Sequence, residues 1–334
     1  MKKIDKVSLI TFVAVALVLV SLMAVGTVYD LQISVALCSL KPGHYYATTI
    51  FGRVFETIGE MPFYLITAFA SAILFHNMSR RTSSIITWIF KIIAIVASVA
   101  MLYYLSYKFF KYLSQHFGFT DLLGDVWDYV SYAILGVCFT VILFYLTRKL
   151  PSSFLNKALI WVAVVVVTAI ISQIATRVLK SMAARPRFRA MFVLQDFSMF
   201  KNWFDFQGKA PELTDDWQII YGATSDWFKS FPSGHTSAGS LVVTLTFMPF
   251  LFTSTNNAKS KIITNVCVFL YIALVMLNRL VVGAHFITDV TFGLFLTLIS
   301  YLIALAIVKV IFNKIKIQPL DENKVPKIVE EIEG

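Results

Sequence analysis

The sequence is poor in charged residues and in residues that interrupt or crosslink a chain. Of its 334 residues only 14% are charged, and only 9 are proline. The three cysteines, Cys38, Cys138 and Cys267, are far apart and two lie in apolar runs, so neither a disulfide framework nor a zinc ligand set is encoded. Hydrophobic residues make up 58% of the chain, well above the share in ordinary soluble domains. The composition predicts a membrane protein that crosses the bilayer several times.

The formal net charge of +10 does not point to nucleic acid. Most lysines and arginines flank the hydrophobic runs, where membrane topology already accounts for them. We therefore expect the lipid bilayer as partner and no nucleic acid. The sequence does not set an oligomeric state.

Runs of about 20 apolar residues, the length of one crossing, predict an all-α, polytopic transmembrane bundle. The first run, from Ser8, is too long for the apolar core of a secretory signal and lacks a clear cleavage site, so we expect it to be retained. Eight spans are expected, near residues 8–29, 61–76, 85–107, 129–147, 158–179, 236–254, 261–278 and 288–312.

The orientation follows from the basic residues in the short connections. With an even number of spans they all fall on one side, which the positive-inside rule makes cytoplasmic together with both termini. They are Lys2, Lys3, Lys6, Arg80, Arg81, Arg148, Lys149, Lys157, Lys259, Lys261, Lys309, Lys314 and Lys316.

The longer connections then face outward. Within 30–60 and 108–128, the stretches DLQISVALCSL and YKFFKYLSQHF predict amphipathic interfacial helices. We expect residues 1–316 to form one membrane-embedded domain. The polar, proline-interrupted end, 317–334, is expected to be a disordered cytoplasmic tail.

Three polar stretches stand at the expected outer face. They are KSMAARPRF from Lys180, FPSGH at 231–235 and NRLVVGAHFITD at 278–289. Ionisable residues are costly near hydrocarbon, so such clusters indicate a functional site. Lys180, Arg187 and Arg279 supply cations suited to phosphate oxygens. Ser233 and Gly234, at a helix start, add backbone N–H groups and allow close approach.

The histidines in these stretches could supply chemistry beyond binding. His285 and Asp289 are four residues apart and share a helical face, so the carboxylate can orient the imidazole, which makes His285 the candidate nucleophile. His235 has no carboxylate at that spacing and suits protonation of a leaving oxygen. Together they predict a two-step displacement through a phosphohistidine. No metal site and no cofactor are expected, because no set of ligands has metal spacing.

The same residues resemble the three signature motifs of the type 2 phosphatidic acid phosphatase (PAP2) superfamily. The matching elements are Lys180 and Arg187 with six residues between them, PSGH at 232–235, and Arg279 followed by His285 and Asp289. The resemblance implies a metal-independent phosphatase with a six-helix core and its active site at the outer membrane face. It assigns phosphate binding to the three cations with Ser233 and Gly234, and catalysis to His285, Asp289 and His235.

Two residues depart from the family pattern. Phe188 stands where proline usually follows the first-motif arginine, and Asn278 where serine usually precedes the third-motif arginine. Pro186 can supply rigidity near the first position and Asn278 keeps hydrogen bonding, so we expect activity to survive. The predicted eight spans exceed the family's six, and we take 85–107 and 129–147 as the added pair.

Other residues near the motifs have open interpretations. Arg185 and Arg189 lie off the motif register and are either part of the site or anchors to lipid headgroups. For His76 and His116 we expect structural or solvated roles. The aromatic segment 188–230 is either a lid that sets specificity or a set of interfacial aromatics.

The leading prediction is a membrane phosphatase acting on a lipid phosphate or isoprenyl diphosphate, in the plasma membrane of a bacterium because the loops are short. A phosphotransferase, a sugar-phosphate phosphatase and a catalytically inactive relative remain open. A transporter that only binds phosphate would explain the cations but not the histidines.

Overall fold

The computed structural model describes residues 6–41, 47–118, 125–252 and 256–314. In these ranges the chain forms helices and no strand. The expected all-α membrane bundle is therefore confirmed. The lysines at positions 2 and 3 and the expected tail, 317–334, lie outside the described residues.

Long helices make up the bundle, and shorter ones lie between them. The long helices are α1 (Lys6–Leu37), α3 (Met61–Ser79), α4 (Ile85–Phe117), α5 (Asp125–Thr147), α6 (Ser152–Ala183), α11 (Ala258–Val281) and α12 (Ile287–Lys314). The short ones are α2 (Ile50–Ile58), α7 (Phe188–Leu194), η1 (Phe197–Met199), α8 (Asp215–Tyr221), η2 (Ser225–Phe228), α9 (Gly234–Gly239), η3 (Ser240–Phe247) and α10 (Met248–Leu251).

Seven of the helical stretches in the described residues are long and apolar enough to cross a membrane, one fewer than predicted. The stretch that is not counted is the eighth expected span, 236–254, because it does not form one long α-helix. That stretch is helical but broken into α9, the 3-10 helix η3 and α10. Pro249 stands at the start of α10, and a proline has no N–H to continue the α-helical ladder of the preceding turn. The N–H of Met248 accordingly bonds to the carbonyl of Leu245.

Of the two interfacial helices expected from the sequence, one is present as a helix and the other was wrong. After a kink at Tyr29, where the backbone leaves the helical conformation, DLQISVAL forms a short helix of its own that ends at Leu37. YKFFKYLSQHF is the last part of α4, which runs on until Gly118 caps it in the left-handed region at φ 70°. No glycine or proline interrupts α4 before that point. The helix is therefore long enough to bring residues beyond 107 to the end of the bundle that holds the polar stretches.

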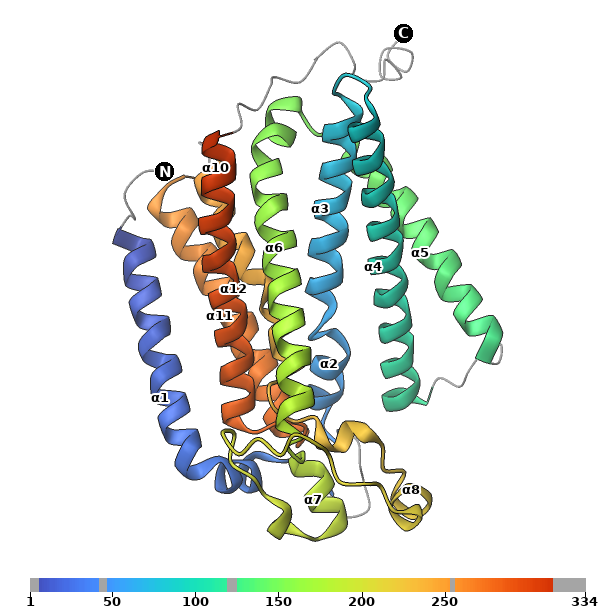
Figure 1. Cartoon of the computed structure of the whole chain (residues 1–334), viewed down its shortest axis with the longest axis vertical. Coiled ribbons are helices and arrows are strands. Elements are labelled where there is room, and N and C mark those ends of the chain that lie inside the picture. Colours follow the sequence, from blue (N-terminus) through green and yellow to red (C-terminus); the bar gives the residue numbers. More distant parts are fainter. Residues whose placement is uncertain (1–5, 42–46, 119–124, 253–255, 315–334) are drawn as a thin grey trace.

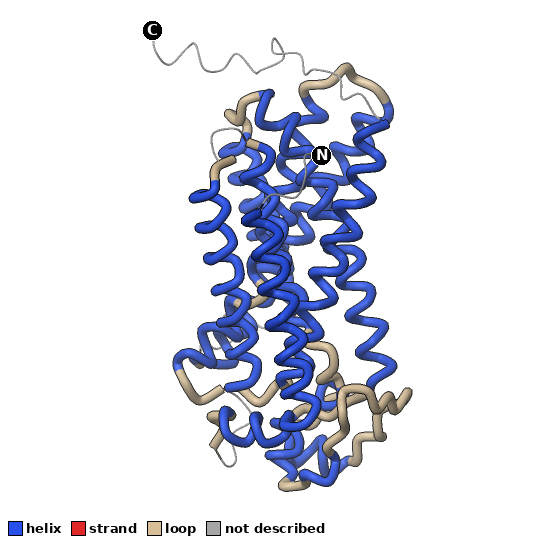
Figure 2. The backbone as a smooth tube through the Cα atoms, turned by 90° about the vertical axis from the view of Figure 1, so that its left-hand side faces the viewer, coloured by secondary structure: helices blue, strands red, loops and turns tan. Residues whose placement is uncertain are grey.

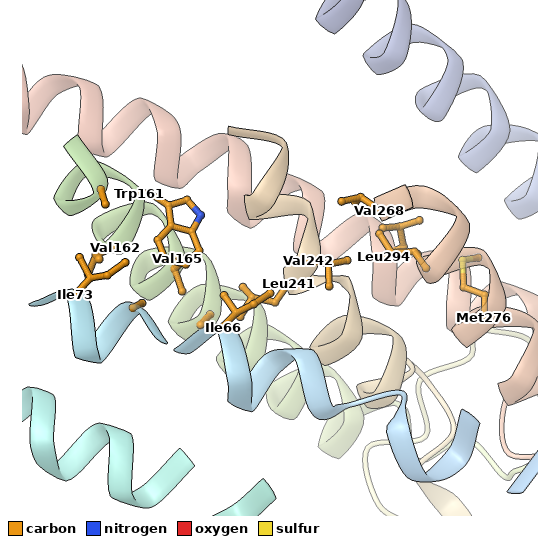
Figure 3. Close-up of a cluster of buried hydrophobic side chains, with 14 of the residues drawn as sticks. Ile66, Ile73, Trp161, Val162, Val165, Leu241, Val242, Val268, Met276 and Leu294 are labelled. Atoms are coloured by element: carbon orange, nitrogen blue, oxygen red, sulfur yellow. The ribbon is translucent and has the colours of Figure 1, made fainter. Parts of the chain in front are cut away.

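The buried core lies where α3, α6, η3, α11 and α12 meet (Figure 3). Ile66 and Ile73 of α3 face Trp161 and its neighbours on α6, with Leu241 of η3 between them. The indole N–H of Trp161 donates to the carbonyl of Thr244 at 3.1 Å. This bond occupies a carbonyl in the 3-10 stretch and ties the broken helix to α6.

The long helices run roughly along the long axis of the molecule (Figure 1). The beginning of α1 and the end of α12 lie at one end, and the segment containing α7 and α8 lies at the other. Figure 2 shows the same loop-rich end from the side. Helix α4 packs on α3, and α5 packs mainly on α4 at the edge of the bundle.

Gly239 allows α9 to approach the junction of α2 and α3. A Cβ atom at this position would lie 2.5 Å from the carbonyl oxygen of Gly59, which is backbone and has little freedom to move. We expect Gly239→Ala to lower the free energy of unfolding by about 1–2 kcal/mol, because overpacking outweighs the gain in helix propensity. Thermal unfolding in detergent measures this. Val266→Ala, on an exposed position of α11, is the control, and equal stability of the two variants would contradict the close contact.

Candidate active site

The three polar stretches converge at one end of the bundle. Lys180 lies in the last turn of α6 and Arg279 in the last turn of α11. His235 is in the first turn of α9, Asp289 in the first turn of α12, and His285 in the connection between α11 and α12. Helix ends thus position all of these groups, and the segment from α7 to η2 lies over the same end (Figure 1).

His285 is buried and held by both ring nitrogens. Its Nδ1 lies 2.6 Å from the carbonyl oxygen of Ser230, and its Nε2 lies 3.5 Å from Nη1 of Arg187. A carbonyl can only accept and a guanidinium can only donate. The proton of the neutral ring is therefore on Nδ1, and Nε2 carries the lone pair. This is the tautomer that a nucleophilic Nε2 requires.

Asp289 reaches His285 through an intermediary. Its Oδ2 is 3.7 Å from Nδ1 of His285, too far for a good hydrogen bond. The same oxygen accepts from the hydroxyl of Ser230 at 2.5 Å and from the N–H of Phe286 at 2.8 Å. The sequence predicted that Asp289 orients the imidazole, and in the structure it does so without a direct hydrogen bond. Ser230 supplies the direct contact, and Asp289 holds Ser230.

Arg185 is part of the site and not a headgroup anchor. Its side chain is 1% exposed, and its two terminal nitrogens bind Asp289 at 2.6 Å and Asp30 at 2.9 Å. It also donates to the hydroxyl of Thr288 and to the carbonyl of Lys201. Asp30 lies in the N-terminal apolar helix with no motif around it, so sequence reasoning missed it. An acidic residue at the end of an apolar run was the available signal.

The three predicted phosphate-binding cations contact protein oxygens. Nζ of Lys180 donates to the carbonyl of Lys229 at 2.6 Å. Arg187 donates to the side chain of Asp226 at 2.9 Å. Nη1 of Arg279 lies 3.1 Å from Glu56, and its Nε is buried without a hydrogen bond. Arg279 therefore still has a donor to offer to a ligand.

Ser233 and Gly234 stand at the start of α9 as predicted, but the backbone N–H of Ser233 already makes a hydrogen bond within the protein. The Oγ of Ser233 caps α9 by accepting from the N–H of Thr236. The N–H of Ser233 donates to the carbonyl of Asp289 at 2.9 Å, which joins the second motif to the third. A Cβ at Gly234 would lie 3.3 Å from Cε of Lys180. Glycine here leaves room for the lysine.

His235 has a carboxylate partner from a distant part of the chain. Its Nδ1 is 2.7 Å from Oε1 of Glu60, and its Nε2 is 3.3 Å from the hydroxyl of Tyr112. Glu60 stands between α2 and α3, and Tyr112 is on α4. Sequence reasoning considered only nearby positions and missed both residues.

Glu56 is the second acidic residue that sequence reasoning missed. It is 3% exposed and lies 3.1 Å from Arg279, 3.6 Å from Arg189 and 3.1 Å from Nε2 of His116. His116 and Arg189 therefore belong to the polar cluster and not to a solvated surface. The pair of glutamates in FETIGE, four residues apart beside an apolar run, was the signal that could have found them.

The two departures from the family pattern have structural explanations. Phe188 is buried at the start of α7 and packs edge-on against Phe286 beside His285. The Asn278 amide donates to the carbonyls of Phe51 and Gly52, at 3.3 and 2.9 Å. Asn278 thereby ties α11 to α2, and hydrogen bonding at this position is kept, as expected.

The aromatic segment 188–230 packs against the membrane helices near the site. Trp227 is fully buried, and the indole of Trp203 donates to the hydroxyl of Thr27 on α1. Trp217 stacks on Phe228 within the segment. These aromatics therefore pack the segment onto the bundle and onto itself. Whether it also selects the substrate stays a prediction.

Cations and burial set the protonation of the groups at the site. Burial first, and then the charges of Arg187, Lys180 and Arg279, lower the pKa of His285 well below its usual value. His285 is therefore neutral at pH 7, as a nucleophile must be. Burial raises the pKa of Asp226, but Arg187 and Arg189 outweigh it and hold that carboxyl well below its usual range. Within the described ranges no three metal-ligating side chains lie close enough to hold an ion.

Arg185 neutralises two buried carboxylates, which generates a stability prediction. Arg185→Ala should lower the free energy of unfolding by about 3–5 kcal/mol, because it leaves Asp30 and Asp289 buried without their cation. Chemical or thermal unfolding in detergent measures the loss. Arg177→Ala, at an exposed position on α6, is the matched control and should change stability by less than about 0.5 kcal/mol. A similarly small effect of both substitutions would show that Arg185 does not stabilise the two buried carboxylates.

Comparison with known proteins yields one match. No curated protein and no solved structure matches the chain. Residues 159–316 match the family model described as the PAP2 superfamily. This region runs from α6 to the end of the described chain and contains the three polar stretches. The arrangement of the stretches at helix ends agrees with this match, and residues 159–316, a little under half of the chain, are similar to the PAP2 superfamily.

Proposed function

We propose that the protein is a metal-independent membrane phosphatase that hydrolyses a lipid phosphate or an isoprenyl diphosphate through a phosphohistidine. Similarity to the PAP2 superfamily supports a phosphatase-type activity. One observation carries the proposal further. His285 is held as the tautomer with a lone pair on Nε2, and that nitrogen faces the guanidinium of Arg187. A nucleophile next to a phosphate-binding cation is the arrangement that phosphoryl transfer requires.

The reaction would proceed in two displacements. Nε2 of His285 attacks phosphorus, the bond from phosphorus to the leaving oxygen breaks, and His235 gives that oxygen a proton. Water then attacks the phosphohistidine, His235 accepts a proton from the water, and the P–N bond breaks to release phosphate. Lys180, Arg187 and Arg279 stabilise the charge on the phosphoryl oxygens in both steps. Ser230 and Asp289 keep the imidazole in place throughout.

The position of the site supports an amphiphilic substrate. The site lies at one end of a bundle of membrane-crossing helices, so a headgroup could meet the cations while its tail stays beside the helices. The same chemistry would serve a soluble sugar phosphate or a phosphotransfer to an acceptor other than water. The comparison substrates below separate these cases.

The distribution of basic residues supports an extracytoplasmic site. Arg80, at the connection of α3 and α4, and Arg148, at that of α5 and α6, lie at the end opposite the segment with α7 and α8 (Figure 1). If the positive-inside rule orients the bundle, that basic end is cytoplasmic and the site faces outward. We further propose that this membrane is the plasma membrane of a bacterium.

The proposal predicts phosphate release by the purified protein in detergent with EDTA present. The panel is phosphatidic acid, phosphatidylglycerophosphate, undecaprenyl diphosphate and a soluble sugar phosphate. His285→Ala should lower turnover by several orders of magnitude, because the nucleophile is removed. Lys180→Ala and Arg279→Ala should lower turnover and also weaken substrate binding.

Each arm of this experiment can contradict a different part of the proposal. Residual turnover in His285→Ala equal to that in the two cation variants would contradict the role of His285. Dependence of the wild type on added Mg²⁺ would contradict metal independence. Release from the sugar phosphate alone would exclude a lipid substrate, and release from none of the four would favour an inactive relative, a phosphotransferase or a phosphate-binding transporter.

The lowered pKa of His285 predicts a pH dependence. The nucleophile must be neutral, so activity is lost as pH falls through the pKa of His285, which lies below its ordinary value of 6.5. Arg187→Gln removes one cause of the shift, raises that pKa and should move the acid limb of kcat/KM to higher pH. The comparison uses one substrate for both proteins, so the ionisation of the substrate cancels. An acid limb at the same pH in both would contradict this assignment.

A further inference from the structure

We infer that Glu60 is a positioning residue for the general acid, holding His235 through Nδ1 so that Nε2 carries the proton that is transferred. The inference rests on the proposed function and concerns a residue outside the region that matches the PAP2 family model. The first half of the chain then takes part in the chemistry, with Glu60 at the α2–α3 junction and Lys108 and Tyr112 on α4.

The contact between Glu60 and His235 has the geometry of a charge-assisted hydrogen bond. Oε1 of Glu60 is 2.7 Å from Nδ1 of His235, and both side chains are largely shielded, at 13% and 10% exposure. A carboxylate accepts, so Nδ1 donates. The second proton of a cationic imidazole must then be on Nε2, the nitrogen that faces away from the carboxylate.

Glu60 is free to make this contact because it does not cap its own helix. It occupies the N-cap position of α3, yet its side chain makes no hydrogen bond to the backbone of that helix. Proline follows two residues later and removes one of the N–H groups that would compete for the carboxylate. Its second oxygen lies 3.4 Å from Nζ of Lys108 and 3.5 Å from the hydroxyl of Tyr64. Three helices therefore orient this carboxylate.

Close packing sets the distance between the two residues. Gly59 and Gly239 bring the α2–α3 junction and α9 together without an intervening side chain. The residue after Gly59 is Glu60, and His235 lies one turn before Gly239 on α9. The backbone contact thus places carboxylate and imidazole at bonding distance without requiring an extended side chain.

Helix α4 contributes the group at the other ring nitrogen. The hydroxyl of Tyr112 is 3.3 Å from Nε2 of His235, and the Tyr112 ring stacks on His116 with 6° between the planes. After His235 has given up its proton, this hydroxyl can donate to the vacated Nε2. In the cationic ring the direction reverses, and Nε2 donates to the tyrosine oxygen. Tyr112 therefore suits both protonation states.

The charges around His235 have opposing effects on its pKa. Burial first, and then the positive charge of Arg279, lower its pKa, while Glu60 acts in the opposite direction. Loss of this carboxylate would lower the pKa of His235 further, so that a smaller fraction of the ring would carry the proton needed for acid catalysis. The titratable and charged groups that face it or interact with it are Glu56, Glu60, Lys108, Tyr112, Arg279 and His285.

Glu56 provides a matched comparison within the same chain. It lies four residues before Glu60, is 3% exposed against 13% for Glu60, and pairs with Arg279 instead of His235. Removal of Glu56 should therefore impair phosphate binding, and removal of Glu60 should impair proton transfer.

The test uses two phosphate monoesters with different leaving groups. An alkyl phosphate needs a proton on its departing oxygen, whereas 4-nitrophenyl phosphate releases a stable anion and needs little acid catalysis. Glu60→Gln should lower kcat on the alkyl ester by about 10²-fold and on the aryl ester by much less. His235→Ala should show the same selectivity. Glu56→Gln should affect both esters alike.

A pH profile and an NMR measurement add readouts that a purely structural role would not move. The alkaline limb of kcat on the alkyl ester, set by the acid form of His235, should move to lower pH in Glu60→Gln and by less in Glu56→Gln, which makes no direct contact with His235. In protein with 15N-labelled histidine, the Nδ1–H signal of His235 should show a strong hydrogen bond that only Glu60→Gln removes. The NMR readout needs no turnover.

The outcomes separate this inference from the proposed function. If the wild type hydrolyses neither ester, the proposed function fails, and the NMR signal alone decides whether Glu60 holds His235. If His235→Ala is selective for the leaving group but Glu60→Gln impairs both esters equally, the inference about Glu60 is overturned. If Glu60→Gln does not fold, Glu60→Asp replaces it. A raised aryl-to-alkyl rate ratio in Glu60→Asp supports the inference, and an unchanged ratio overturns it.

Discussion

The structure depends on the neutralisation of positive charge inside a membrane protein. A phosphate-binding site needs cations, yet a buried, unpaired guanidinium would cost several kcal/mol. The chain meets this constraint with acidic residues from elements far apart in sequence. Asp30 of α1 and Asp289 of α12 share Arg185, and Glu56 of α2 faces Arg279. Each ion pair also joins two elements. The pairs that neutralise the buried cations therefore also hold the helices of the bundle together.

The network that neutralises Arg185 also holds the imidazole of His285 in position. Asp289 receives hydrogen bonds from Arg185 and from Ser230, and the carbonyl of Ser230 accepts from the imidazole. Any displacement of α1 would therefore be transmitted through Asp30 and Arg185 to Ser230, which holds the imidazole of His285. The position of the imidazole is a property of several helices and not of the third motif alone.

The region outside the family match takes part in the site through α2, α3 and α4. Glu56, Glu60, Tyr112 and His116 surround the second-motif histidine and the third-motif arginine. Helices α4 and α5 correspond to the pair that we took as an addition to a six-helix core. Since α4 places Tyr112 at 3.3 Å from His235, it is more than a peripheral attachment. Helix α5 packs on α4 and supports it.

Hydropathy alone determined the class of the protein and nearly all of its crossings, because a long run of apolar residues is stable only inside a membrane or a protein core. At 236–254 it predicted a helical run but not its interruption, since the apolar composition of that stretch does not reveal that a 3-10 segment precedes Pro249. The motif spacings likewise singled out from local sequence the three cations, both histidines and Asp289, which the fold brings to one end of the bundle.

The partners of those residues were decided only by the tertiary structure. Sequence spacing paired Asp289 with His285 and left His235 without a carboxylate. In the fold, the Ser230 carbonyl takes the place of Asp289 at Nδ1 of His285, and Glu60 binds His235 from a position 175 residues earlier in the chain. The physical reason is that periodicity reports neighbours on the same helix. Contacts between helices depend on packing, such as the approach of Gly239 to Gly59, which no local pattern encodes.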